Sequence, residues 1–120
     1  MIVLDFTEIP AGPNQRLHWA AKAKTNKKFR DWACIQTLSA RNAQGGITFD
    51  CVRVSAVFTR RAIGTADVDN EVARLKPVID GIVDGGLIPN DTPAHLQLGT
   101  ITQERGPRGL RVLIEPVPAA

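Results

Sequence analysis

The chain has 120 residues, of which 43% are hydrophobic and 22% are charged, and its formal net charge is +3. This length and composition predict one globular domain, residues 1–120, with a small hydrophobic core. No apolar run approaches the ~20 residues that span a bilayer, and the first residues lack the features of a secretory signal. We therefore expect a cytoplasmic protein with no membrane partner, in which Cys34 and Cys51 are reduced thiols that fit no metal or redox spacing.

The sequence pattern predicts six elements in the order β-α-β-α-β-β. The predicted elements are a strand over 1–9, a helix over 25–43, a strand over 47–61, a helix that begins at Asp69 or Asn70 and ends before Gly85, and strands over 94–104 and 109–117. The turn at 105–108 predicts that the last two strands form a hairpin. We therefore expect a single small α+β domain with a mixed or antiparallel sheet and the helices packed on one face.

Two of these elements have a clear apolar face. The first helix begins at a cap, Thr25 or Asn26. Its predicted apolar face consists of Phe29, Trp32, Ala33, Ile35 and Leu38. In the strand that follows, Val52, Val54 and Ala56 alternate with residues of the opposite face.

The charges are distributed unevenly along the chain. Residues 1–61 contain ten Lys and Arg against four Asp and Glu, whereas residues 62–120 contain five against eight. A basic surface attracts phosphates and a local acidic cluster holds cations, so the asymmetry fits a metal-dependent enzyme that acts on a polyanion. The simpler interpretation is compositional scatter, because the overall excess is modest.

Asp67 and Asp69 lie two residues apart before the second predicted helix. In an extended segment both carboxylates point to one side, ~7 Å apart at the backbone, and can converge on a hard cation such as Mg²⁺. Such a pair is common in solvated loops and does not by itself identify a metal site. Asp69 or Asn70 can also cap the helix that follows.

Along the second predicted helix, Lys76 and Asp80 fall on the face of Asp69, beside a separate apolar stripe. The simpler interpretation of Lys76 and Asp80 is an ordinary i,i+4 ion pair. Because Pro77 cannot donate a backbone hydrogen bond, we expect one helix with a kink near Lys76. The alternative is that Pro77 occupies the first turn of a new helix. After this helix, a turn returns Asp91 as a third candidate oxygen ligand.

Together these residues resemble the RusA family of Holliday junction resolvases, which are small phage- and prophage-derived endonucleases. The family pattern is Asp-x-Asp-Asn, then a lysine, an aspartate four residues later, a glycine and an Asp-Asp pair. Here it reads DVDN, Lys76, Asp80, Gly86 and Asn90-Asp91. A loop rich in proline and asparagine and a basic helix containing KFRDWA also match, so the resemblance covers nearly the whole chain.

The resemblance implies a homodimeric, Mg²⁺-dependent endodeoxyribonuclease of a bacterium or prophage, in which Mn²⁺ can substitute. It implies that the enzyme resolves four-way DNA junctions by paired nicks during recombination and repair. The implied metal ligands and catalytic carboxylates are Asp67, Asp69 and Asp91, the implied catalytic lysine is Lys76, and the implied supporting residues are Asn70, Asp80 and Asn90. In such a site the lysine stabilises charge on the scissile phosphate.

Two departures from the family pattern affect these assignments. The gap between Asp-Asn and the lysine is three residues longer than usual, which moves Lys76 ~4.5 Å along a helix but keeps it on the same face. The long side chain of Lys76 and a kink at Pro77 can absorb that shift. Asn90 replaces the first aspartate of the Asp-Asp pair and brings no charge, so metal binding is assigned to Asp91.

The basic half supplies the candidate DNA contacts, each of which is also a plausible solvated surface residue. These are Arg16, Lys22, Lys24, Lys27, Lys28, Arg30, Arg60 and Arg61. His18 and Trp19 lie in the loop before the basic helix. Trp19 either stacks on an exposed base or packs in the core. His95 is interpreted as structural.

Two rival functions belong to other classes. The longer gap and Asn90 motivate a catalytically weak or inactive protein of the same fold that binds junctions or other DNA. The other rival is a small metal-dependent phosphohydrolase, which predicts turnover of free nucleotides and no preference for junctions.

Overall fold

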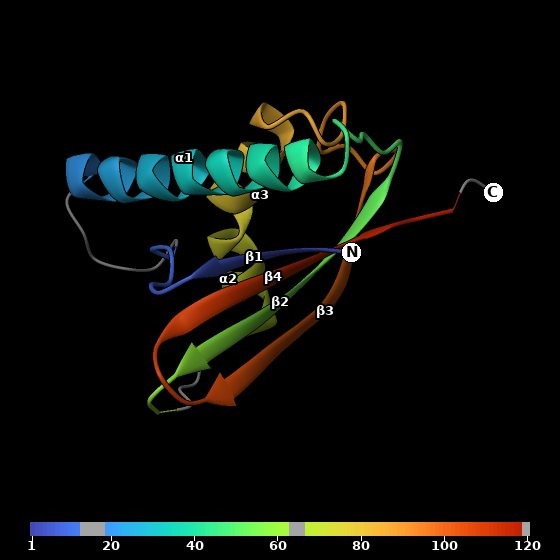
Figure 1. The fold of residues 1–120 in the computed structure, drawn as a ribbon. Coiled ribbons are helices and arrows are strands. Elements are labelled where there is room, and N and C mark those ends of the chain that lie inside the picture. Colours follow the sequence, from blue (N-terminus) through green and yellow to red (C-terminus); the bar gives the residue numbers. More distant parts are fainter. Residues whose placement is uncertain (13–18, 63–66, 119–120) are drawn as a thin grey trace.

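Among the residues that the structure describes, four strands form one mixed sheet with helices packed against one face (Figure 1). The computed structural model describes residues 1–12, 19–62 and 67–118. The elements are β1 (Ile2–Phe6), α1 (Trp19–Ala43), β2 (Val52–Arg60), α2 (Val68–Arg74), α3 (Lys76–Asp84), β3 (Leu96–Arg105) and β4 (Gly109–Pro116). The predicted α+β class and order of elements are confirmed, with the second helical region divided in two.

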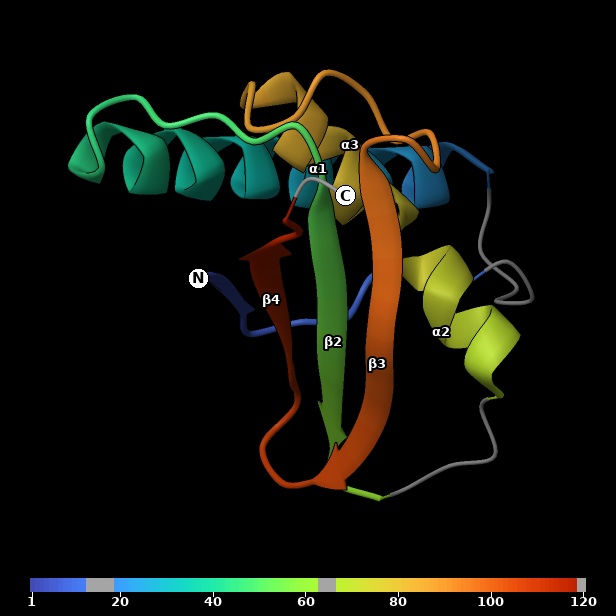
Figure 2. The same ribbon diagram turned by 90° about the vertical axis from the view of Figure 1, so that its right-hand side faces the viewer.

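The last strand of the chain lies inside the sheet, because the strand order is β1-β4-β2-β3. β4 pairs antiparallel with both β1 and β2, whereas β3 pairs parallel with β2. The predicted hairpin between β3 and β4 is therefore wrong, since β2 separates them (Figure 2). The connection instead passes the end of β2, where the Gly106 amide donates to the Arg60 carbonyl at 2.9 Å. A turn-forming segment brings the chain round, but it does not determine which strands pair.

The core lies between one face of the sheet and helices α1 and α3. The predicted alternation in β2 is confirmed, because Val52, Val54 and Ala56 are buried while Arg53 is exposed. β1 and β4 also contribute buried residues at every second position: Ile2, Leu4 and Phe6 from β1, and Leu110, Val112 and Ile114 from β4. This one-sided burial gives the domain a single core and leaves the opposite face of the sheet to solvent.

Helix α1 begins earlier than predicted and buries a narrower face. Thr25 is not its cap, because the Thr25 hydroxyl donates to the Ala21 carbonyl inside the helix. The preceding WAAKAK segment consists mostly of strong helix formers, which extend the helix toward its N-terminus. The buried residues of α1 are Phe29, Ala33 and Thr37. The other predicted core positions are exposed, with Trp32 at 37%, Ile35 at 63% and Leu38 at 40%.

The second helical region is two helices that meet at Leu75. The expected single kinked helix is wrong, and the alternative holds, because Pro77 lies in the first turn of α3. Leu75 keeps helical dihedral angles and is fully buried, so the chain changes helix without leaving the core. At this position proline has no backbone donor to lose and its φ suits the helix start.

Helices α1 and α3 pack closely at Gly81 of α3 and at Gly85, the residue that caps its C-terminus. A Cβ atom on Gly81 would lie 2.3 Å from the Arg30 carbonyl oxygen, and one on Gly85 would lie 2.8 Å from Thr37 Cβ. At the exposed rim of the contact, Arg30 donates two hydrogen bonds to the Asp84 carboxylate. This close packing fixes the first turn of α3 relative to the basic part of α1.

Cys34 and Cys51 are free thiols, as predicted. Within residues 1–12, 19–62 and 67–118, no helix combines the length and the apolar character that crossing a membrane requires.

Candidate functional site

Lys76 lies between two carboxylates that come from different parts of the chain. Its Nζ atom is 2.6 Å from Asp91 Oδ2 and 2.9 Å from Asp80 Oδ1. Asp91 is the larger cause, and Asp80 the second, of a raised pKa at Lys76. The same contact lowers the pKa of Asp91. Lys76 and Asp91 are therefore both charged at neutral pH, and the 60% exposed Lys76 side chain remains accessible to a ligand.

Local structure explains how these three side chains meet. Lys76 is the first residue of α3 and Asp80 lies one turn later, so the predicted i,i+4 pair is present. Asp91 follows in the turn after α3, where Asn90 Oδ1 accepts hydrogen bonds from the Thr92 amide and hydroxyl at 3.0 and 2.6 Å. Asn90 thus holds the turn that presents Asp91.

Asp67 and Asp69 lie at the start of α2, and both are exposed. The cap is Asp67 rather than Asp69 or Asn70, because Asp67 Oδ1 accepts a hydrogen bond from the Asn70 amide at 3.1 Å. The expected extended pair does not form, since α2 begins at Val68 and Asp69 is already helical. Asn70, the third residue of α2, is half-buried.

The structure does not gather the three predicted metal-binding carboxylates. Among the residues that it describes, no three Asp, Glu, His or Cys side chains lie close enough together to hold a metal ion. Asp69 is seven positions before Lys76, roughly 10 Å along a helical path, whereas Asp91 contacts Lys76 directly. The residues therefore do not fit a Mg²⁺ ion bound by Asp67, Asp69 and Asp91 in this arrangement.

The sequence analysis did not identify a buried charged network under α2. Glu71 is 1% exposed, and Arg60 donates to its two carboxylate oxygens at 2.8 and 2.9 Å. Gln103 of β3 donates to the same carboxylate at 3.4 Å. Glu71 and Leu75 are spaced as one buried helical face, so a carboxylate in that stripe was a signal that a cation must accompany it.

Arg74 extends this network to the chain that follows β1. Its Nε atom lies 3.4 Å from Glu71 Oε1, and its Nη1 atom donates to the Pro10 carbonyl at 2.8 Å. The guanidinium lies over Gly12, where a Cβ atom would be only 2.7 Å away. Burial lowers the pKa of Arg74, whereas hydrogen bonding to Glu71 raises that of Arg60. The middle and the end of α2 are therefore fastened to two strands and a loop.

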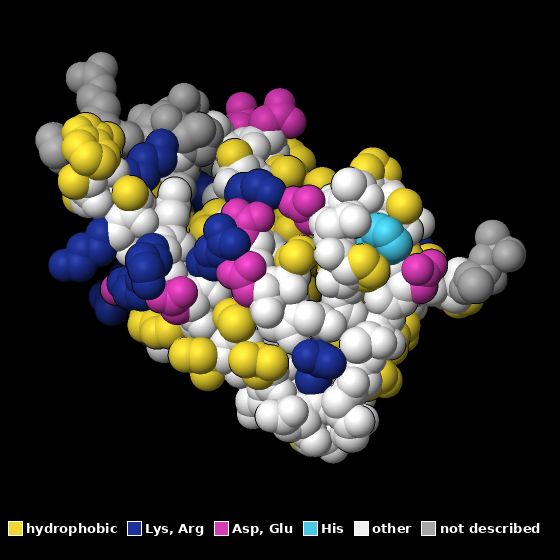
Figure 3. Space-filling model, turned by 90° about the horizontal axis from the view of Figure 1, so that it is seen from above, with side chains coloured by type: hydrophobic (Ala, Val, Ile, Leu, Met, Phe, Trp, Pro, Cys, Tyr) yellow, Lys and Arg dark blue, Asp and Glu magenta, His cyan; other side chains and the backbone are white. Residues whose placement is uncertain are grey.

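The predicted DNA-binding residues fall into three groups. Arg16 and His18 lie outside the described residues. Several cations are paired: Lys27 with Asp31, Lys28 with Glu8, Arg30 with Asp84 and Arg60 with Glu71. The others, Lys22, Lys24 and Arg61, are half-buried or exposed. Figure 3 shows Lys and Arg side chains over the N-terminal half of α1 and the neighbouring start of α3, with Asp and Glu side chains among them.

Two further side chains were interpreted from the sequence. Trp19 is 76% exposed at the start of α1, so packing in the core is wrong and stacking on a base stays a prediction. His95 Nδ1 lies 2.7 Å from the Asp50 carbonyl oxygen, next to the point where β2 begins. That contact fits a structural histidine.

No protein-family model matches this chain, and no curated protein matches it significantly.

Proposed function

We propose that this protein is an endodeoxyribonuclease selective for branched DNA, which resolves Holliday junctions by paired phosphodiester hydrolysis during recombination and repair. The observation that carries the proposal is the 2.6 Å contact between Lys76 and Asp91, fifteen positions apart in sequence. These are the lysine and the last carboxylate of the sequence motif, and their contact supports a common role. The basic surface beside them supports a polyanionic substrate.

The chain's own residues suggest a division of roles. Lys76 stabilises negative charge on the scissile phosphate, because an ammonium placed in advance needs little reorganisation during the reaction. Asp80 and Asp91 orient that ammonium from two sides. Asp67 and Asp69 supply the remaining acidic groups of the site. The cations of α1 attract the DNA and position it.

The test uses a labelled four-way junction incubated with the full chain and Mg²⁺, followed by denaturing electrophoresis. We expect paired nicks in opposite strands, with loss of nicking but retained junction binding in Asp69→Asn. Glu115→Gln, a carboxylate change on β4, is the matched control and should cut normally. Nicking that survives Asp69→Asn would refute the proposed site.

Mg²⁺, with Mn²⁺ as a substitute, is the cofactor proposed from the resemblance, and no reaction step is assigned to it. A site already assembled would raise the melting temperature by linkage when millimolar Mg²⁺ is added. Because the carboxylates are separate in this structure, we expect no shift with the protein alone and a shift when junction DNA is also present. A Mg²⁺-induced shift without DNA would contradict the separation of these carboxylates.

A second candidate function is binding of junctions or other DNA by a catalytically weak protein of the same fold. The lack of a cluster of three potential metal ligands among the described residues favours this alternative. Retention of the junction in a native gel without nicks, over a range of Mg²⁺ and Mn²⁺ concentrations, would support it over the nuclease.

We also propose a homodimer in the cytoplasm of a bacterium or prophage host. A four-way junction presents two equivalent strands, which a two-fold symmetric dimer can cut in the same way. Sedimentation equilibrium of the protein with and without junction DNA tests the dimer. The dimer proposal would be overturned if a single protein chain is bound to each junction and the junction still receives paired nicks.

A further inference from the structure

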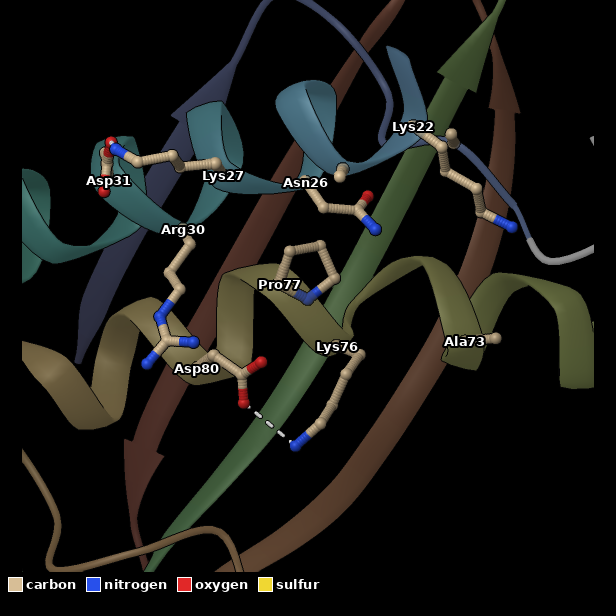
Figure 4. A pocket seen from close by; sticks show the side chains of 11 residues that line it. Lys22, Asn26, Lys27, Arg30, Asp31, Ala73, Lys76, Pro77 and Asp80 are labelled. Atoms are coloured by element: carbon tan, nitrogen blue, oxygen red, sulfur yellow. Dashed lines mark hydrogen bonds and ion pairs between the residues drawn. The ribbon is translucent and has the colours of Figure 1, made fainter. Parts of the chain in front are cut away.

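A cleft of about 620 Å³ lies between the N-terminal half of α1 and the region where α2 meets α3 (Figure 4). Lys76 and Pro77 of α3 form one side of it, and Lys22 and Asn26 of α1 form the other. The volume falls within the roughly 300–1,000 Å³ typical of small-molecule sites. It suits one nucleotide and is far too small for a duplex.

The floor of the cleft consists of small or flat apolar residues: Ala11, Ala23, Ala73 and Pro77. Methyl groups and a proline ring leave the space open and present a smooth apolar surface. A planar base is the part of a nucleotide that such a surface accommodates, because its faces are apolar and its edges polar.

Asn26 places a polar group against this floor. Its Oδ1 atom is buried and, among the described residues, has no hydrogen-bond partner. A buried acceptor without a partner is unfavourable, and a hydrogen-bond donor of a ligand that reaches this oxygen would satisfy it. Figure 4 shows the Asn26 amide pointing into the space between α1 and the start of α3. An amide offers an acceptor beside donors, which is the combination that reads the edges of bases.

Charged side chains of both signs lie around the rim of the cleft. Four cations line it, Lys22, Lys27, Arg30 and Lys76, against two carboxylates, Asp31 and Asp80. Asp80 holds Lys76 and Asp84 holds Arg30, so both charged ends are fixed near the rim. Asp91 also pairs with Lys76, so the charges around the cleft nearly balance. A phosphate next to the bound base would therefore meet individual ammonium groups, those of Lys22 and of the exposed Lys76, rather than a broad positive field.

We propose that this cleft binds one unpaired nucleotide of a DNA strand, with the base on the apolar floor beside Asn26 and the adjoining phosphate near Lys22 and Lys76. The inference deepens the proposed function, on which it rests, by naming the part of branched DNA that the protein recognises. The proposal requires a base at the branch point to leave its pair, because bases inside a duplex are stacked and inaccessible.

The experiment follows the amide signals of the ¹⁵N-labelled full chain during titration with the tetranucleotide (dT)₄ and, separately, with thymidine monophosphate, both without metal. We expect (dT)₄ to shift the signals of Ala23, Asn26 and Ala73 and to bind more tightly than the mononucleotide. Ala73→Met, at an exposed helical position, fills the floor and should weaken (dT)₄ binding at least about tenfold, a 1.4 kcal/mol change. Ala21→Met, at an exposed position of α1 outside the cleft, is the matched control and should bind normally.

The outcomes separate this inference from the nuclease proposal. If (dT)₄ shifts the amide signals of the cleft residues but junctions are not nicked, the nuclease proposal is refuted and the inference is supported. Normal nicking with no shifts in the cleft, or with full (dT)₄ affinity in Ala73→Met, would overturn the inference alone. Equal affinity for the mononucleotide would overturn recognition of a DNA strand, because it identifies a free nucleotide as the ligand.

Discussion

Arg60 holds both carboxylate oxygens of Glu71, so the end of β2 is fastened to the middle of α2 by a buried ion pair. Asp67 and Asp69 project from the first turns of the same helix. The direction in which these two acidic side chains point therefore depends on a residue that lies in the core and contacts no ligand. Gln103 and Arg74 complete this support from β3 and from the helix itself.

Glu71→Leu should destabilise the fold by about 3 kcal/mol, because removing one member of a buried ion pair leaves the other charge without its partner. Urea unfolding at pH 7 measures the change. In the double variant Glu71→Leu with Arg60→Met, we expect most of the lost stability to return, since both charges are then absent. A single variant that loses less than about 1 kcal/mol would mean that Arg60 reaches solvent easily.

Asp67 can be tested for two roles separately. Asp67→Ala removes the N-cap of α2 and should destabilise the protein by about 1 kcal/mol, whereas Asp67→Ser keeps a capping oxygen and should lose little stability. Both changes remove the carboxylate, so both should abolish nicking of a four-way junction if that charge is needed. Thermal unfolding and the junction assay on the same preparations distinguish the two roles. Full activity in Asp67→Ser would assign Asp67 to capping alone.

Lys76→Gln should lower the nicking rate by about a hundredfold, the scale on which a single electrostatic contact to a transition state acts. Junction affinity should change by less than a few-fold, because many other cations contribute to binding. Arg111→Gln removes a cation paired with Asp5 outside the proposed site and serves as the control. A rate unchanged in Lys76→Gln would show that Lys76 only pairs with Asp80 and Asp91.

Acid should weaken the contact between α1 and α3. Hydrogen bonding from Arg30 lowers the pKa of Asp84 below its usual value. Because the pKa of Asp84 is lower in the folded than in the unfolded chain, its ionised carboxylate stabilises the fold at any pH above the ordinary carboxyl pKa of about 3.9. This stabilisation is lost as the pH falls below that value and through the pKa of Asp84 in the folded chain. Melting temperatures from pH 7 down to pH 3 should therefore fall less steeply in Asp84→Asn than in the parent chain.

Asp31→Asn is the comparison for this pH series, because Asp31 forms an exposed pair with Lys27 within α1 and joins no second element. The melting temperature of Asp31→Asn should depend on pH in the same way as that of the parent chain. A profile in Asp84→Asn that matches the parent at every pH would show that the Arg30–Asp84 pair contributes nothing to stability.

The sequence predicted the parts of the fold that depend on local pattern. Alternating apolar residues such as Val52 and Val54 predict a strand and its buried face, because successive side chains of any strand point to opposite faces. Pairing between strands is a property of the whole sheet, so the turn before Gly109 predicted a hairpin that does not exist. In α1, periodicity alone could not show that Ile35 lies outside the contact area.

The part of the candidate site that depends on local pattern was also predicted from the sequence. The contact between Lys76 and Asp80 follows from helical spacing, and a glycine-terminated helix followed by a short turn returns Asp91 to them. The position of Asp69 depends instead on where α2 starts and on the break at Leu75. Glu71 was overlooked because its partner Arg60 comes from a distant strand and had been assigned to DNA on charge alone.

The inner position of β4 has a consequence for how the chain assembles during synthesis. β1, made first, forms its sheet hydrogen bonds with β4, which is made last, and β2 loses one of its two neighbours if β4 is missing. A nascent chain that ends before residue 109 therefore has no strand to join its two halves. The ribosome must release the C-terminal strand before β1 can form its sheet hydrogen bonds, so the domain completes folding only after translation has passed its last strand.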